Sequence, residues 1–129
     1  MTEHIGALSE SAENYLKTIG RLCQEHGHAH VVDISRALNV KKPSVTAALS
    51  LLRDVGLIEY KTYTPVTLTE KGQQYSDQLR AKAMTITSFF IDCGGFDEKR
   101  AAEAACLLEH WINDDEISIL QSMLKKEES

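Results

Sequence analysis

Residues 31–68 place two short helical patterns before two short β-branched patterns, an order that few folds accommodate. Apolar residues at positions 31, 34 and 38 predict a helix of a few turns that ends at Asn39. After the link NVKK, Pro43 opens a second helix, which ends near Gly56 and has an apolar face of Val45, Ala48, Leu49 and Leu52. The runs LIEYKT and VTLT follow, separated by YTP, and predict a two-stranded hairpin. Two short helices followed by a hairpin indicate a winged helix-turn-helix.

Longer helical patterns flank this segment. The apolar spacing of residues 8–25 predicts a first helix, which the polar run HGHAH and Gly27 terminate. Thr69 begins a long helix that extends as far as Gly94 and Gly95. Two more helices are expected, over residues 97–111 and then from a cap at Asn113 or Asp114.

The predicted fold is mainly α, with a winged helix-turn-helix domain over residues 1–74 and a helical domain over residues 75–129. Three helices of this length bury little apolar surface alone. We therefore expect the helical domain to form a homodimer, and Trp111 lies where a dimer or domain contact would bury it.

The net charge of −5 argues against a nucleic-acid partner until it is divided along the chain. Residues 1–75 carry eight basic and eight acidic residues, whereas residues 76–129 carry six and eleven. Within residues 36–61, five basic residues outnumber two acidic ones. This local positive charge suits a phosphate backbone.

The second helix of the helix-turn-helix is expected to enter the major groove with its N-terminal residues foremost. Basic side chains and small hydroxyls there can reach phosphates or base edges, and the hairpin tip can hold the DNA backbone. The alternative is an ordinary polar helix start. The candidate DNA-binding residues are Arg36, Lys41, Lys42, Pro43, Ser44, Thr46, Ala47, Arg53, Lys61, Thr62 and Tyr63. A dimer of this kind implies a double-stranded, palindromic operator.

No apolar run approaches the roughly 20 residues that a bilayer span needs, and the start MTEHIGALSE lacks the features of a secretory signal. We therefore expect a cytoplasmic protein without a membrane partner. The three cysteines are expected to be reduced thiols, with Cys23 and Cys93 on apolar stripes that favour a place in the core. Three alternating histidines in HGHAH could bind a metal, but a solvated turn fits their composition better.

The helical domain contains the motif CLLEH, formed by Cys106, Glu109 and His110. Positions i, i+3 and i+4 share one helix face, so a thiolate or its backbone carbonyl, a carboxylate and an imidazole could converge on one cation. The alternative from spacing alone is a small buried thiol beside an exposed Glu and an exposed His.

The stretches SAENYLKTIGRL, DISRALNVKKPSVTAALSLLRDVGLIEY and VTLTEKG, and above all EAACLLEHWINDDE, resemble a family of metal-dependent repressors. This family is typified by the diphtheria toxin repressor and the manganese transport regulator. The resemblance runs from about Ser11 to the last residue, where larger members add an SH3-like domain. It therefore implies the two-domain form.

The resemblance implies a corepressor metal held between the first and fifth helices, which fixes the angle between the two domains. The fifth-helix ligands fall at Cys106, Glu109 and His110, and the first-helix ligand falls at Asn14. Glu10, one turn earlier, could replace Asn14 or bind through water. Two further ligand positions of the family fall at Lys17 and Ala83, so a second, ancillary metal is not expected, and Ala47 stands where iron-responsive relatives often carry a base-reading Gln.

A set of sulfur, nitrogen and oxygen donors favours Fe(II), Co(II), Ni(II) or Zn(II) over Mn(II), and we expect Fe(II). Other functions stay open at this point. One is a winged-helix regulator that responds to an organic ligand or to oxidation of Cys106, or that represses without metal. Another is a small zinc hydrolase, because CLLEH resembles an inverted zinc motif, although so short a chain leaves little room for a substrate cleft.

Overall fold

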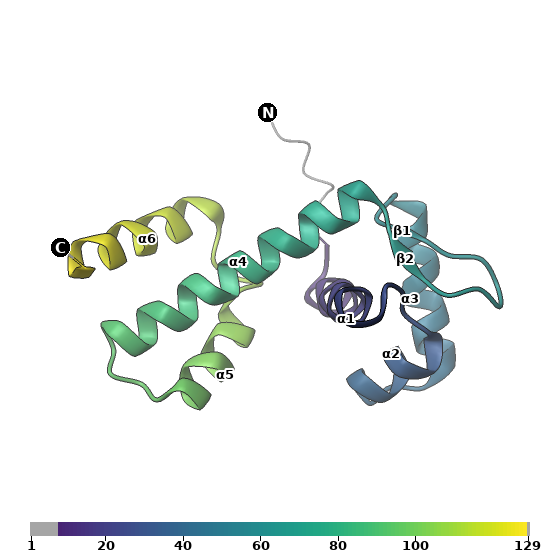
Figure 1. The fold of residues 1–129 in the computed structure, drawn as a ribbon, viewed down its shortest axis with the longest axis horizontal. Helices are drawn as coiled ribbons and strands as arrows, with labels where there is room; N and C mark the ends of the chain where they lie inside the picture. Colours follow the sequence, from purple (N-terminus) through teal and green to yellow (C-terminus); the bar gives the residue numbers. More distant parts are fainter. Residues whose placement is uncertain (1–7, 129) are drawn as a thin grey trace. The chain divides into compact units, whose positions relative to one another are not determined.

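The computed structural model describes residues 8–128 and divides into two compact units, the first ending at Ser76 and the second beginning at Asp77. The element order is α1 (Glu10–His26), α2 (Val31–Leu38), α3 (Lys42–Asp54), β1 (Ile58–Glu59), β2 (Thr67–Leu68), α4 (Glu70–Asp92), α5 (Glu98–Leu108) and α6 (Asp114–Glu128) (Figure 1). The prediction of a mainly helical chain with a winged helix-turn-helix and a second helical unit is confirmed. None of the helices in residues 8–128 is both long and apolar enough to cross a membrane.

Helix α1 forms the centre of the first unit and is capped at both ends. The Ser9 hydroxyl accepts a hydrogen bond from the backbone N–H of Ala12 at 3.0 Å. At the other end Gly27 adopts the left-handed conformation, with φ 84°, and donates its N–H to the Cys23 carbonyl at 2.7 Å. The buried side of α1 includes Leu16 and Ile19, which are fully buried.

Helices α2 and α3 form the helix-turn-helix. Asn39 ends α2 in the left-handed conformation, with φ 54°, which Asn tolerates better than most side chains. Helix α3 then buries Val45, Leu49 and Leu52, which recur at helical spacing and are fully enclosed. Its remaining faces therefore stay available to a partner.

The hairpin is shorter than predicted, because β1 and β2 pair over only two residues, Ile58 with Leu68 and Glu59 with Thr67. A bridge between Ala29 and Val66 extends the pairing to the segment between α1 and α2. Each of these two residues donates its N–H to the other's carbonyl, at 2.9 and 2.7 Å. The sequence run HGHAH is thus not simply a solvated turn, since its alanine, Ala29, is buried.

Helix α4 begins against the hairpin. The Thr69 hydroxyl accepts the Gly72 N–H at 3.0 Å and donates to the Gly56 carbonyl at 2.7 Å. Gly72 lies so close to Leu57 that a Cβ there would stand 1.8 Å from the Leu57 carbonyl oxygen. Only glycine fits this contact between α4 and the residue that precedes β1.

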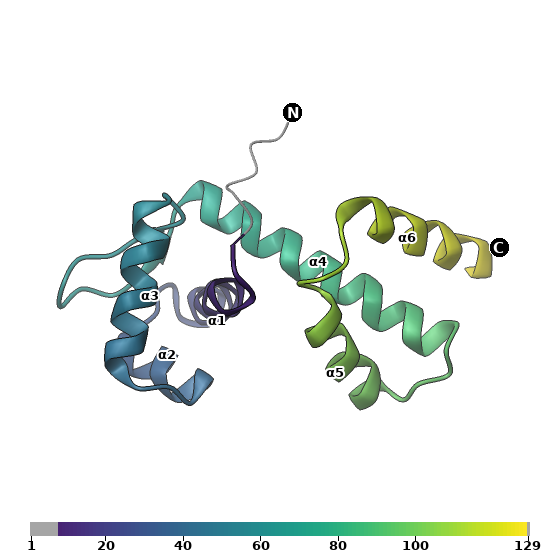
Figure 2. The same ribbon diagram turned by 180° about the vertical axis from the view of Figure 1, so that it is seen from behind.

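The second unit is made by the C-terminal part of α4 with α5 and α6 (Figure 2). Its core contains Ile86, Ala105 and Ile117, with four partly buried side chains packed against it: Phe90, Leu108, Ile112 and Leu120. Helix α6 begins with a capping box. The Asn113 side chain accepts the Glu116 N–H at 2.8 Å, and the Glu116 carboxylate accepts the Asn113 N–H at 3.0 Å.

Two expectations for the second unit were wrong. Helix α5 ends at Leu108 and not at Trp111, because residues 109–111 form a turn in which the N–H groups of Trp111 and Ile112 both reach the Leu108 carbonyl. Cys93 directly follows the last residue of α4, Asp92, and is exposed, although its spacing favoured the core.

Candidate DNA-binding surface and metal centre

The N-terminal half of α3 presents a continuous exposed surface because its buried residues all lie on the opposite side. Every candidate in this helix and at its cap is exposed, namely Lys41, Lys42, Pro43, Ser44, Thr46 and Ala47. The Thr46 hydroxyl donates to the Lys42 carbonyl at 3.1 Å, which leaves its oxygen able to accept from a base or a water. Two lysines and two hydroxyls at a helix start match what groove recognition requires.

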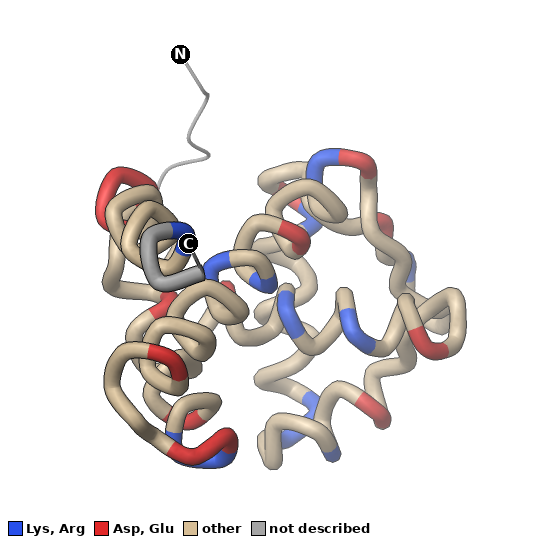
Figure 3. Tube along the Cα trace, turned by 60° about the vertical axis from the view of Figure 1, so that its left-hand side comes forward, with Lys and Arg blue, Asp and Glu red and all other residues tan. Residues whose placement is uncertain are grey.

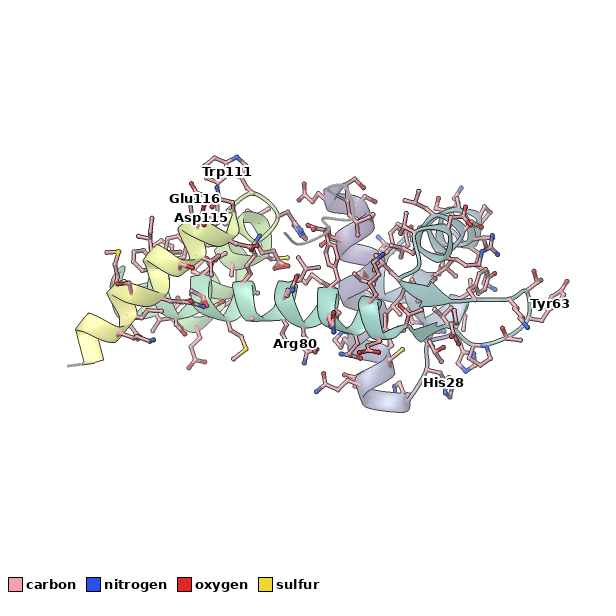
Figure 4. All side chains as sticks on the ribbon, turned by 90° about the horizontal axis from the view of Figure 1, so that it is seen from above. His28, Tyr63, Arg80, Trp111, Asp115 and Glu116 are labelled. Carbon is pink, nitrogen blue, oxygen red and sulfur yellow. The ribbon has the colours of Figure 1, made fainter. Side chains whose placement is uncertain are left out.

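The loop between β1 and β2 forms the wing tip, and residues 61–65 are all exposed. Thr64 organises this turn, because its hydroxyl donates to the Lys61 carbonyl at 2.7 Å and accepts the Lys61 N–H at 3.2 Å. Tyr63 takes a left-handed φ of 68° and is fully exposed, so its ring points away from the rest of the unit (Figure 4). Lys61, Thr62 and Tyr63 therefore lie where a DNA backbone could contact them.

The two arginine candidates are exposed and weakly paired. Arg36 lies 4.0 Å from Asp33, and Arg53 lies 3.5 Å from Asp54. Exposed pairs at such distances contribute little to stability. Both guanidinium groups can therefore exchange their carboxylate for a phosphate at small cost.

Sequence reasoning missed two residues of this surface. Thr64 shapes the wing turn, and its position before Pro65 was the available signal. Leu51 is 50% exposed on α3, whereas the apolar pattern of that helix directed attention to its buried neighbours. An exposed leucine on this helix can contact a thymine methyl group.

In the second unit the structure brings Glu109 and His110 together. Glu109 is 1% exposed and is the only charged residue of residues 8–125 that is buried. Its Oε2 lies 3.8 Å from Nε2 of His110, whose side chain is 5% exposed. A carboxylate and an imidazole side by side in a buried position are a donor pair suited to a divalent cation.

The third member of the motif lies elsewhere. Cys106 is exposed on α5, and the end of that helix at Leu108 removes His110 from the regular helix face. Over the described part of the chain, no three His, Cys, Asp or Glu side chains gather closely enough to hold a metal among themselves. The alternative drawn from spacing alone was a buried Cys106 beside an exposed Glu109. The structure shows the reverse, with the Cys106 thiol exposed and the Glu109 carboxylate buried.

The first-helix candidates belong to the first unit. Asn14 is half-buried and Glu10 is exposed, one turn apart on α1. Their neighbour Glu13 is engaged locally, because its Oε2 accepts a hydrogen bond from the Tyr75 hydroxyl at 2.5 Å. Asn14 and Glu10 thus remain the candidate oxygen ligands on this part of α1, as the family resemblance implies.

Cys23 does not offer a thiolate. Burial raises the pKa of the Cys23 thiol, against a smaller opposite effect of a backbone hydrogen bond to Leu68. The thiol donates weakly to the Val66 carbonyl at 3.7 Å. Cys23 thus packs beside the hairpin as a neutral group, in keeping with the expectation that it is a packing residue.

The acidic surplus of the second unit distinguishes it from the first (Figure 3). Asp114, Asp115 and Glu116 stand in the first turn of α6, where the helix dipole favours negative charge. The two units therefore differ in charge as well as in fold, and the basic candidates concentrate in the winged unit.

A winged helix-turn-helix unit with a basic recognition helix, followed by a helical unit with a buried carboxylate–imidazole pair, defines a two-unit DNA-binding regulator. Residues 7–66 match the family described as "Iron dependent repressor, N-terminal DNA binding domain", and residues 69–129 match "Iron dependent repressor, metal binding and dimerisation domain". The chain belongs to this iron dependent repressor family, which includes the diphtheria toxin repressor and manganese regulator type, and is a metal-dependent transcriptional regulator. Family members are repressors and not enzymes, which removes the zinc hydrolase alternative.

Individual relatives cover both units. The chain is 33% identical over 120 residues to an uncharacterized HTH-type transcriptional regulator of Methanocaldococcus jannaschii, covering 92% of this chain and 96% of that protein. It is 30% identical over 119 residues to the HTH-type transcriptional regulator MntR of Lysinibacillus sphaericus, covering 90% of this chain and 85% of the relative. The crystal structure of T. acidophilum IdeR superposes with a TM-score of 0.78 at 29% identity over 94% of this chain, which spans 56% of that longer chain.

Proposed function

We propose that this chain is a cytoplasmic, homodimeric repressor that binds a palindromic operator and uses a divalent cation, preferentially Fe(II), as corepressor. The observation that carries the proposal is the buried Glu109 carboxylate beside the His110 imidazole, in the unit matched as metal binding and dimerisation domain. A buried carboxylate is costly unless a positive charge compensates it. A bound divalent cation would meet that need.

The proposed ligands are Glu109 and His110 from the structure, and Cys106 and Asn14, with Glu10 as the alternative to Asn14, from the family resemblance alone. Their sulfur, nitrogen and oxygen atoms suit Fe(II), Co(II), Ni(II) or Zn(II) better than Mn(II). The family description names iron, whereas relatives include both IdeR and MntR. These observations support iron as the first ion to test.

A bound divalent cation would supply positive charge beside the buried Glu109 carboxylate and the His110 imidazole. The chain's own residues do the rest of the work. Helix α3 presents Lys42, Ser44 and Thr46 to the groove, and the wing presents Lys61 to the backbone. Cation binding and operator binding then strengthen each other by the same factor, which is typically worth about 1 to 3 kcal/mol.

Dimerisation through the second unit is supported by its exposed apolar side chains. Among residues 77–125, six large hydrophobic side chains are exposed: Met84, Phe96, Leu107, Trp111, Ile119 and Met123. Trp111 points away from its unit at the turn after α5 (Figure 4). Exposed apolar surface of this kind is typical of an interface, and a second copy of the chain is the proposed occupant.

The metal part of the proposal is tested by replacing His110 with Ala. In an anaerobic DNA-binding assay on a mixed oligonucleotide pool, the parent chain should bind more tightly with Fe(II) than with chelator. His110→Ala should lose that stimulation and keep its sedimentation as a dimer, while His26→Ala, which alters an exposed histidine of the first unit, should behave as the parent does. Full metal stimulation of His110→Ala would rule out this metal centre.

The DNA surface is tested separately through the salt dependence of binding. Lys42→Ala should weaken binding to all sequences and reduce the slope of log K against log salt by about 1, because one phosphate contact is lost. Lys71→Ala is the matched control, since Lys71 is exposed on α4 outside the proposed surface. Equal slopes for both variants would remove Lys42 from the interface.

A second candidate is favoured by the exposure of Cys106. An accessible thiol on α5, the helix that leads to Glu109 and His110, could be oxidised, so peroxide would act as the signal. This candidate would be favoured if peroxide changed DNA binding of the parent but not of Cys106→Ser, and if metal changed DNA binding of neither.

A further inference from the structure

The segment between α1 and α2 brings two imidazoles together outside the proposed metal centre. Nε2 of His28 lies 3.1 Å from Nε2 of His30, and the two rings meet edge to face with their centroids 4.8 Å apart. His30 is exposed and His28 is half-buried, so a solute can reach both nitrogens. His28 lies at the base of the wing in Figure 4.

The spacing of these nitrogens matches that of two ligands on one cation. Imidazole nitrogens bind Zn(II) at about 2.0–2.1 Å, so two of them separated by a ligand angle of about 90–109° lie about 2.9–3.3 Å apart. The observed 3.1 Å falls inside this range. In the absence of a cation, one imidazole donates a hydrogen bond to the other at the same separation.

The backbone holds the two histidines in this relation. Ala29, between them, is buried and bound to Val66 by hydrogen bonds in both directions, and His30 has the extended conformation that precedes α2. Residues i and i+2 of an extended segment project to the same side. Little ordering of the backbone is therefore required when a ligand binds, which favours chelation.

We propose that His28 and His30 form a second, bidentate site for a divalent cation that prefers imidazole, of the Zn(II), Ni(II) or Cu(II) class. Waters would complete the coordination, as the two imidazoles are the ligands that the segment provides. Because Ala29 is tied to Val66, a cation there would also stiffen the start of β2 and the base of the wing. The site belongs entirely to the DNA-binding unit and shares no residue with the Glu109–His110 pair.

Isothermal titration of the full chain with Zn(II) tests the stoichiometry. The parent should bind one more equivalent than His28→Gln and His30→Gln, each of which should lose about a hundredfold in affinity at this site because chelation is lost. His26→Gln is the matched control, since His26 is the last residue of α1, just before this segment, and its Nε2 lies 3.8 Å from Glu25. The control should keep the parental stoichiometry.

Amide hydrogen exchange gives a second measurement that does not depend on the other metal centre. Zn(II) should slow exchange of the Ala29 and Val66 amides in the parent and in a His110→Ala variant, and should leave them unchanged in His28→Gln. Three outcomes would overturn the proposal. The parent, His28→Gln and His30→Gln could bind the same number of Zn(II) ions, or only one of these two variants could lose the ion. The control His26→Gln could also lose as much Zn(II) binding as they do. Failure of the Glu109–His110 centre would leave these readouts unaffected.

Discussion

Of the three cysteines, only Cys23 is partly enclosed, and burial raises the pKa of its thiol. A raised pKa means a smaller thiolate fraction at any pH near or below that pKa, and the thiolate is the reacting form. At pH 8 iodoacetamide should therefore modify Cys93 and Cys106 several times faster than Cys23. Mass spectrometry of a labelling time course measures the three rates, and in urea the difference should disappear. Equal rates in the folded protein would contradict the assignment.

Tyr75 and Glu13 join α4 to α1 within the first unit through a hydrogen bond of 2.5 Å. A hydrogen bond to a charged acceptor in a part-buried position contributes about 1.5–3 kcal/mol. Tyr75→Phe should therefore lower the free energy of unfolding of the first unit by about 1–2 kcal/mol, as measured by urea denaturation. Tyr63→Phe removes a hydroxyl from a fully exposed ring and should change the free energy of unfolding by less than about 0.5 kcal/mol. Similar effects of both variants would show that the contact adds nothing.

At the scale of elements, the start of α4 depends on one hydroxyl. The Thr69 hydroxyl accepts the Gly72 N–H and donates to the Gly56 carbonyl. Thr69→Ala should therefore lower the free energy of unfolding by about 1–2 kcal/mol. Thr69→Ser retains the hydroxyl and should recover most of that loss. Thermal unfolding of the two variants beside the parent gives the comparison, and equal loss in both would assign the effect to the methyl group instead.

The elements of the fold could be predicted from local sequence because caps and apolar spacing agree. Ser9, Asp97 and Asn113 all cap the helices that follow them, as their positions suggest. The pairing of Ala29 with Val66 could not be predicted, because it joins residues 37 apart in the chain and neither has a distinctive side chain. The end of α5 was misplaced by three residues: Glu109, His110 and Trp111 continue the helical pattern, but the chain turns after Leu108, whose carbonyl accepts the N–H groups of Trp111 and Ile112.

For the site, spacing identified Glu109 and His110 but not their environment. Only the folded second unit shows that the carboxylate is inside and the Cys106 thiol outside. The DNA surface was easier to predict, because the buried residues Val45, Leu49 and Leu52 determine which residues of α3 face outward. The sequence pattern therefore predicts well which face of a helix is exposed, but predicts poorly which residues distant in the chain become neighbours.

At the scale of the whole molecule, the exposed apolar residues of the second unit should decide the oligomeric state. A charge at Leu107, which is largely exposed on α5, should prevent a second copy from packing there. Leu107→Glu should sediment as a monomer at concentrations where the parent is a dimer, with its helical circular dichroism unchanged. Lys99→Glu, an exposed polar position in the first turn of α5, is the control for added charge. A dimeric Leu107→Glu would place the interface elsewhere.

The bridge between Ala29 and Val66, together with the pairing of Ile58 and Leu68, sets the strand register behind the wing tip. Residues 61–65 extend past those pairs and are exposed throughout. Insertions or deletions at the tip would therefore leave the helix-turn-helix undisturbed. Descendants of one ancestral scaffold can accordingly lengthen or shorten this loop as their operators diverge, and an engineer could graft a new reading loop at the same place.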